Sequence, residues 1–223
     1  MQTAPEKHKV FVIHGYGSPR FMMKKIHQSI LHENFPAENY SYRSMKEDLD
    51  TLGKQLYSKI KESHCDAVSF VTHSMGALVV RSMYQYAMKD EHFPLIYRIV
   101  MIAPPNSGAE LANFYSSFKI FRKLGGTNLE HMRTTPDSLA SKLPIPVNSE
   151  IGIIAGISGR KRWYNIFIKE DNDGVLTPER TRLGVEKDFI VIKSEHNWLT
   201  QKEYVCKLTV EFLKFGCFKS KLN

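Results

Sequence analysis

Several features are missing from this sequence of 223 residues. No apolar run approaches the ~20 residues that a membrane span needs. Residues 1–9 are polar and lack the apolar centre of a secretory signal peptide, so we expect a cytoplasmic protein, although a cleaved leader would leave the same sequence. The only cysteines are Cys65, Cys206 and Cys217, an odd number without tight spacing. These absences argue against a disulfide framework and a zinc site, and they favour a reducing compartment.

Acidic residues are outnumbered, since 31 Lys and Arg face 23 Asp and Glu, giving a formal net charge of +8 and a pI near 9.3. Such an excess suits nucleic acid, an anionic lipid surface or simple solubility. The one tight basic run, 160–162, precedes Trp163 and Tyr164, but no nucleic-acid-binding motif accompanies it. We therefore expect a solvated basic surface and no nucleic-acid partner. The sequence does not specify an oligomeric state.

The pattern of apolar residues indicates an α/β protein. The length suits one well-buried domain, so 1–223 is predicted to be a single domain. Apolar, β-branched runs alternate with segments of helical spacing, which predicts a mostly parallel sheet with helices on both faces. Strands are expected at 9–13, 39–43, the first half of 67–81, 97–103, 150–157 and 189–192, and helices at 21–35, 44–63, the second half of 67–81, from Ser107 towards Gly125, and around 205–212.

The segment 67–81 combines a buried strand with a helix, and Ser74 lies between them. At such a tight turn a serine hydroxyl projects above the sheet edge, and the amide of Met75 points from a helix N-terminus towards any negative charge that forms there. A small residue is needed two positions later, where strand and helix crowd, and Gly76 meets that need. The alternative interpretation is a serine that caps an ordinary helix.

Further polar segments follow other predicted strands. His14-Gly15 comes directly after 9–13, and His196 comes just after the last strand. Because ligands bind at the carboxyl ends of parallel strands, we expect these residues to share one edge with Ser74. The run 171–174, Asp-Asn-Asp-Gly, is either an ordinary turn or part of a site. A calcium loop does not fit, since its twelfth position would be Arg182 and not a glutamate.

Taken in order, these segments resemble the α/β-hydrolase superfamily, above all compact bacterial lipase- and esterase-like serine hydrolases with a Thr-His-Ser-Met-Gly elbow. Thr72 stands where most such elbows carry their first glycine. The resemblance implies the α/β-hydrolase fold with few or no additional N-terminal strands. It also implies a catalytic triad of Ser74, Asp173 and His196, with Asp171 as the reserve acid.

The same resemblance implies an oxyanion hole made by the amides of Tyr16 and Met75, with His14 as a structural residue. The implied chemistry is acyl transfer from an ester or thioester to water through an acyl-enzyme on Ser74, which requires no metal or organic cofactor. Two alternatives stay open: an acyltransferase with the same triad, and a non-catalytic ligand-binding protein on a hydrolase scaffold.

The segment 107–146 resembles the excursion that crosses the active site in small lipase-like hydrolases. Ser107 and Glu110 have the spacing of a capping box, and the helix that they open carries an aromatic stripe with cations beside it. This stripe either packs on the body of the protein or forms a wall of an acyl pocket, with its cations meeting anionic lipid. On the second interpretation, 107–146 is a lid or cap, Phe114 and Phe118 bind substrate, and the substrate is a small-molecule or lipid ester.

Overall fold

A computed structural model describes residues 7–116, 128, 130–135, 137–158 and 170–222. Within these residues six strands form one sheet in the order β2-β1-β3-β4-β5-β6, and all neighbours are parallel. The strands are β1 (His8–Ile13), β2 (Ala37–Tyr40), β3 (Ala67–His73), β4 (Leu95–Ile102), β5 (Glu150–Ile157) and β6 (Asp188–Lys193). The predicted parallel α/β sheet is confirmed.

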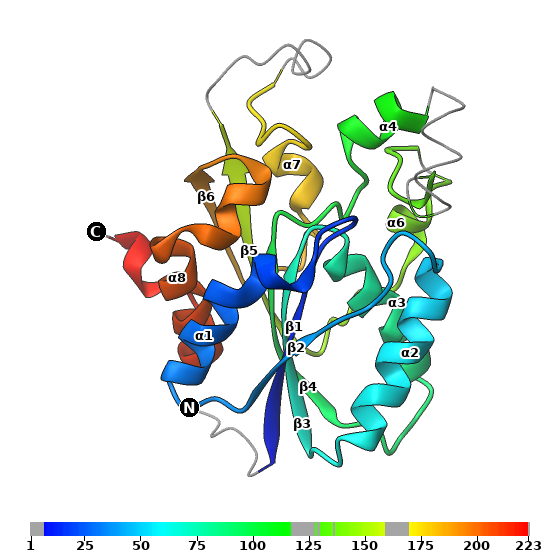
Figure 1. The fold of residues 1–223 in the computed structure, drawn as a ribbon, viewed down its shortest axis with the longest axis vertical. Coiled ribbons are helices and arrows are strands. Elements are labelled where there is room, and N and C mark those ends of the chain that lie inside the picture. Colours follow the sequence, from blue (N-terminus) through cyan, green and yellow to red (C-terminus); the bar gives the residue numbers. More distant parts are fainter. Residues whose placement is uncertain (1–6, 117–127, 129, 136, 159–169, 223) are drawn as a thin grey trace.

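Helices cover both faces of the sheet, with α1 and α8 on one side and α2 and α3 on the other (Figure 1). The α-helices are α1 (Lys24–His32), α2 (Leu49–Glu62), α3 (Gly76–Ala87), α4 (Glu110–Ser116), α6 (Leu139–Lys142), α7 (Pro178–Thr181) and α8 (Glu203–Phe215). Short 3-10 helices are η1 (Arg20–Met23), η3 (His196–Gln201) and η4 (Lys219–Leu222). No described helix is both long and apolar enough to span a membrane.

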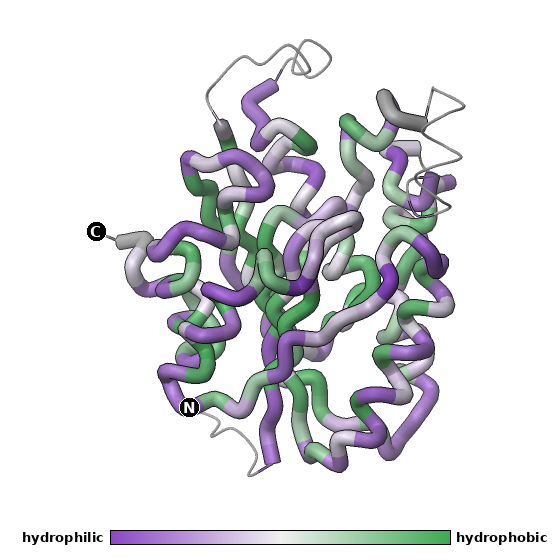
Figure 2. The backbone as a smooth tube through the Cα atoms, in the orientation of Figure 1, coloured by the Kyte–Doolittle hydropathy of each residue, from purple (hydrophilic) through white to green (hydrophobic). Residues whose placement is uncertain are grey.

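Two hydrophobic clusters hold these layers together. Successive side chains of β1 alternate between them, because Val10 and Val12 face the cluster under α1 and α8 while Phe11 and Ile13 face the cluster under α2 and α3. All four side chains are fully buried. The hydrophobic stretches accordingly lie in the central strands, and hydrophilic stretches are frequent on the outer helices (Figure 2).

In the strand register, the last residues of neighbouring strands lie side by side. Ile13 pairs with Thr72, His73 pairs with Ile102, and Ile157 pairs with Lys193. The residues that follow β1, β3, β4, β5 and β6 therefore meet at the carboxyl edge of the sheet, as the predicted topology requires.

Some element boundaries differ from the predicted ones. The helix expected from Ser44 begins at Leu49, because Asp48 is its cap and accepts a hydrogen bond from the Thr51 amide at 2.8 Å. Ser44 lies in the preceding turn, where its hydroxyl accepts from the amide of Gly17 at 3.1 Å. The capping box expected from Ser107 and Glu110 is wrong: the Glu110 carboxylate instead accepts from Thr177 and Arg180, near the start of α7.

Candidate active site

Ser74 occupies a strained turn between β3 and α3. Its φ is +51°, in the left-handed region that a residue with a side chain seldom adopts. The Ser74 amide donates to the carbonyl of Ile102 at 2.9 Å, and its carbonyl accepts from Ala77 at 3.0 Å. The turn is therefore fixed through the backbone, while the side chain stays partly exposed at the sheet edge.

Two glycines allow β1 and its loop to approach this turn. A Cβ atom on Gly76 would lie 2.7 Å from the carbonyl oxygens of both Ile13 and His14. A Cβ atom on Gly15 would lie 3.0 Å from the Cβ of Ser74. The crowding at Gly76 agrees with the sequence-based expectation. Thr72, in the place of the usual first glycine, is fully buried and fits without displacing the turn.

The two residues expected to form the oxyanion hole, Met75 and Tyr16, lie in the segments next to Ser74 and Gly15. The carbonyl of Met75 accepts from Leu78 and Val79, whereas the Met75 amide has no acceptor among the described residues. An unpaired amide at the start of a helix favours negative charge nearby. Tyr16 follows Gly15 in the loop after β1, and its side chain is partly buried. Both predicted oxyanion-hole residues are thus in segments that flank Ser74.

Asp173 and His196 form a buried pair at the carboxyl edge of the sheet, after β5 and β6 respectively. Their exposed fractions are 2% and 6%, and Nδ1 of His196 donates to Oδ2 of Asp173 at 2.7 Å. The other carboxylate oxygen accepts from the amides of Val175 and Leu176 at 2.9 and 3.0 Å. The His196 amide also donates to the Asp173 carbonyl at 2.9 Å. This arrangement fixes the ring orientation and leaves Nε2 of His196 as the nitrogen available for proton transfer.

His73 packs against His196, an arrangement that the sequence analysis did not anticipate. The two ring centroids are 4.8 Å apart, and Nε2 of His73 donates to the carbonyl of His196 at 3.2 Å. Burial, reinforced by the neighbouring His196, lowers the pKa of His73 to about 3. A neutral His73 adds no repulsion to a positive charge that forms on His196.

His14 supports the loop that carries Tyr16. Its ring stacks on Tyr42 with centroids 4.2 Å apart, and the Tyr42 hydroxyl donates to the His14 carbonyl at 2.5 Å. Burial lowers the pKa of His14 and raises that of Tyr42. Both side chains are therefore neutral near pH 7, which suits the structural role expected for His14.

The structure brings Ser74, Asp173 and His196 to one edge but does not link all three. No hydrogen bond joins the Ser74 hydroxyl to His196 among the described residues; the contact between them runs through His73, the neighbour of Ser74. Nucleophile and base often come into reach only when substrate binds. The reserve acid Asp171 is exposed. Nor do the described residues bring together three or more potential metal ligands of the His, Cys, Asp or Glu type.

The aromatic residues expected to bind substrate cannot be placed against this site. Phe118 and the side chain of Phe114 lie outside the described residues, although the backbone of Phe114 belongs to α4. The tight basic run 160–162 also lies outside them.

Arg81 is a further residue of the site region that sequence reasoning missed. This α3 side chain is 2% exposed, and burial lowers its pKa to about 10. The guanidinium donates to the carbonyls of Asn106, Leu143 and Pro144. It thereby fastens both ends of the excursion 107–146 to the helix that begins after Ser74. A lone arginine among the apolar residues of that helix was the available signal.

Solved structures with a similar fold include lipases and esterases. The mature lipase BlEst2 of Bacillus licheniformis matches with a TM-score of 0.69 and 17% identity, over 96% of this chain and 92% of that one. The lin2722 gene product of Listeria innocua matches with a TM-score of 0.66 and 16% identity, over 94% and 95%. Phospholipase PlaB of Legionella pneumophila matches with a TM-score of 0.63 and 18% identity, over 79% and 45%, so this chain spans under half of that protein. These matches confirm the α/β-hydrolase fold.

At the level of sequence, a family model described as a domain of unknown function, DUF7379, matches residues 6–154, about two thirds of the chain. The matched part includes Ser74 and the loop after β1, and it ends before Asp173 and His196. No curated protein sequence matches the chain at a significant level.

Proposed function

We propose that this chain, which belongs to the DUF7379 family, is a serine hydrolase that cleaves carboxylic esters through an acyl-enzyme on Ser74. The observation that carries the proposal is the buried pair of Asp173 and His196, hydrogen bonded at 2.7 Å, at the same sheet edge as a serine with a φ of +51°. Strained backbone of this kind is kept where function needs it. The fold shared with lipases and esterases supports the same chemistry.

In the proposed mechanism, His196 takes the proton from the Ser74 hydroxyl as its oxygen attacks the ester carbonyl. Asp173 holds the imidazole in the tautomer with Nε2 free and stabilises the imidazolium that forms. The amides of Met75 and Tyr16 receive the oxyanion, and one such donor is typically worth ~3 kcal/mol in the transition state. His196 then protonates the leaving alcohol, and a water activated by the same ring releases the acid.

The surroundings of the site support three further parts of the proposal. The segment 107–146 acts as the lid or cap over the acyl group, since Arg81 anchors its two ends beside α3. The substrate is a small-molecule or lipid ester. Cys65, Cys206 and Cys217 are all unpaired, as expected for a protein of the cytoplasm.

Labelling with a fluorophosphonate, followed by mass spectrometry, tests the nucleophile. We expect a single adduct on Ser74 that is lost in Ser74→Ala and in His196→Ala. The variant Ser58→Ala, which changes an exposed serine of α2, is the matched control and should label like the parent protein. A folded protein that stays unlabelled, with and without detergent, would exclude a working nucleophile and favour a binding role.

A further inference from the structure

A cavity of about 540 Å³ opens beside the loop that follows β1. Its walls are the segments 17–20 and 41–46, and two of its buried lining residues are the stacked pair His14 and Tyr42. The Ser44 hydroxyl accepts from the Gly17 amide at 3.1 Å and so ties the two walls together. His14 and Gly17, which line the cavity, flank Gly15 in the same loop, and Gly15 lies against Ser74.

The lining of this cavity carries charge of one sign. Arg20, Arg43 and Lys46 line it, and no carboxylate does. None of the three cations forms an ion pair with a described residue. Of the nearby carboxylates, Asp48 caps α2 and Glu38 pairs with two lysines, one in β1 and one in α2. Glu47 follows Lys46 but does not line the cavity, and one of its carboxylate oxygens is buried without a partner among the described residues.

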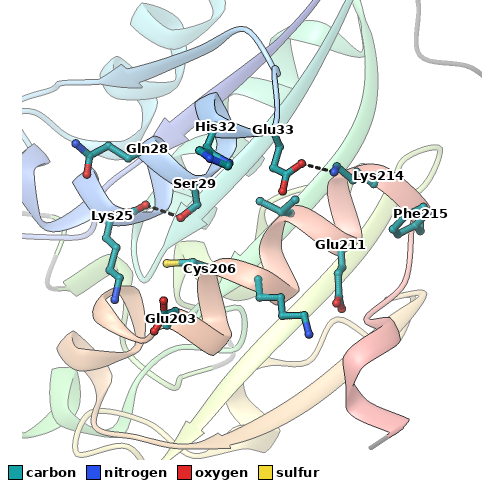
Figure 3. Close-up of a pocket in the computed structure, with 12 residues that line it drawn as sticks. Lys25, Gln28, Ser29, His32, Glu33, Glu203, Cys206, Glu211, Lys214 and Phe215 are labelled. Atoms are coloured by element: carbon teal, nitrogen blue, oxygen red, sulfur yellow. Dashed lines mark hydrogen bonds and ion pairs between the residues drawn. The ribbon is translucent and has the colours of Figure 1, made fainter.

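Two other cavities among the described residues carry a different charge pattern. The cavity of about 560 Å³ between α1 and α8 (Figure 3) is lined by three lysines and three glutamates, and Glu33 pairs with Lys214 inside it. The cavity beside α7 is lined by four carboxylates and one arginine, and it includes Asp171 and Thr177, close in sequence to Asp173. Of these three cavities, only the one beside the loop after β1 is lined by cations without a carboxylate.

We propose that the basic cavity binds an anionic oxyacid group, phosphate above all, carried by the ester that Ser74 cleaves. Two guanidinium groups and an ammonium group match the oxygens of such a group, and the hydroxyls of Ser18 and Ser41 also line the cavity. This inference rests on the proposed hydrolase function, whose failure the tests below separate from its own.

The phosphate has two candidate sources, a lipid headgroup or a soluble ester. Met45 lines the cavity and is 50% exposed, and Phe21, next to Arg20, is 65% exposed. Exposed apolar side chains among cations suit a lipid surface. The free cavity volume suits a soluble phosphate ester equally.

Binding is tested first in the Ser74→Ala protein, where no turnover occurs, by calorimetric titration with glycerol 3-phosphate. Replacing Arg20, Arg43 and Lys46 together by Gln should weaken binding at least tenfold. The control replaces Lys89, Lys202 and Lys207, three exposed lysines outside the cavity, by Gln and should change the dissociation constant less than twofold. Equal binding by both triple variants, or no binding at millimolar concentration, would overturn the anion site.

Turnover is tested with two esters that share one acyl chain, 1-butyrylglycerol 3-phosphate and 1-butyrylglycerol. The parent protein should prefer the phosphorylated ester by about tenfold or more in kcat/KM, and the cavity variant should lose that preference. Hydrolysis of both esters at equal rates would leave the hydrolase standing and overturn the subsite. Charge-dependent binding without hydrolysis of either ester would support the anion site and overturn the hydrolase.

A third experiment distinguishes a lipid headgroup from a soluble ester as the source of the phosphate. The 1-oleoyl analogue is presented in phosphatidylcholine vesicles, and the butyryl ester is presented in solution. If the headgroup is the natural source, Phe21→Ser, at an exposed residue outside the cavity lining, should lower hydrolysis in vesicles several-fold and leave the soluble ester unaffected. An unchanged rate on vesicles would assign the cavity to soluble phosphate esters.

Discussion

The two halves of the candidate site are held in different ways. On the β5–β6 side, the Asp173 carboxylate accepts three hydrogen bonds, so direction and distance are fixed by polar contacts. On the β1–β3 side, the position of Ser74 is set by a strained backbone and by close approach at Gly15 and Gly76. The carboxylate proposed to orient His196 thus accepts hydrogen bonds at both oxygens, whereas the hydroxyl of the proposed nucleophile forms none with the described residues.

Removing the nucleophile should have the largest effect on activity. We expect Ser74→Ala to lower kcat by about 10⁴-fold or more, because no acyl-enzyme can form. The variant should fold, since alanine removes only a partly exposed hydroxyl. Steady-state hydrolysis of a butyryl ester measures the loss, with circular dichroism as the check on folding. Retention of activity would move the nucleophile to another residue.

Removing the charge of Asp173 should lower the catalytic rate nearly as much. We expect Asp173→Asn to lower kcat by about 10³- to 10⁴-fold, because an amide cannot accept from all of its present donors while orienting His196. The exposed Asp171→Asn is the matched control, with a change below about twofold. The same ester assay compares the pair. A larger loss in Asp171→Asn would exchange the two assignments.

Adding a side chain at Gly76, where β1 and α3 approach closely, should lower the stability of the protein. We expect Gly76→Ala to lower the free energy of unfolding by about 2–4 kcal/mol, because the new Cβ would meet the carbonyls of Ile13 and His14. Gly184, with a φ of +78° and nothing within 4 Å of its Cβ position, is the control. Gly184→Ala should cost only about 1 kcal/mol of backbone strain. Urea denaturation measures both, and equal losses would refute the steric explanation.

The buried His73, which contacts His196, should make the stability of the protein depend on pH. The pKa of His73 is lowered to about 3, so between pH 6.5 and 3 the unfolded chain binds a proton that the folded protein refuses. The free energy of unfolding therefore falls as pH falls below 6.5, by about 2 kcal/mol from pH 7 to pH 5 for this residue. We expect His73→Gln to flatten this slope. The exposed His92→Gln should keep it, and an equal slope in both variants would contradict the buried, neutral His73.

The sequence predicted the fold well where local pattern decides. The strand 150–157 has the predicted bounds, because its apolar, β-branched run ends at clear turn residues. Helix starts were less predictable, since the choice between Ser44 and Asp48 depends on hydrogen bonds from distant residues, one of them the side chain of Asn128 to the Ser44 carbonyl. The residues of the candidate triad were implied by the resemblance to α/β-hydrolases, and their catalytic roles stay proposals.

Contacts between distant segments could not be read from the sequence. His73 and His196 are 123 residues apart, and only the ordering of β3 and β6 brings their rings together. The basic cavity likewise joins Arg20 to Arg43, which come together because β2 pairs with β1. In the sequence these cations looked dispersed, which suggested a solvated surface and hid their common cavity.

The guanidinium of Arg81 has a consequence for how this protein could diversify. By holding the carbonyls of Asn106 and Leu143 together, it closes the intervening stretch into a loop whose ends stay fixed whatever lies between them. Lengthening a closed loop costs little, about 0.6 kcal/mol for each doubling of its length. Insertions should therefore be tolerated at exposed positions between these two anchors, whereas Met132 and Ala140 pack in the core and Asn128 holds the turn before α2. Arg81 thus lets the exposed parts of this segment vary in length while the sheet and α3 stay unchanged.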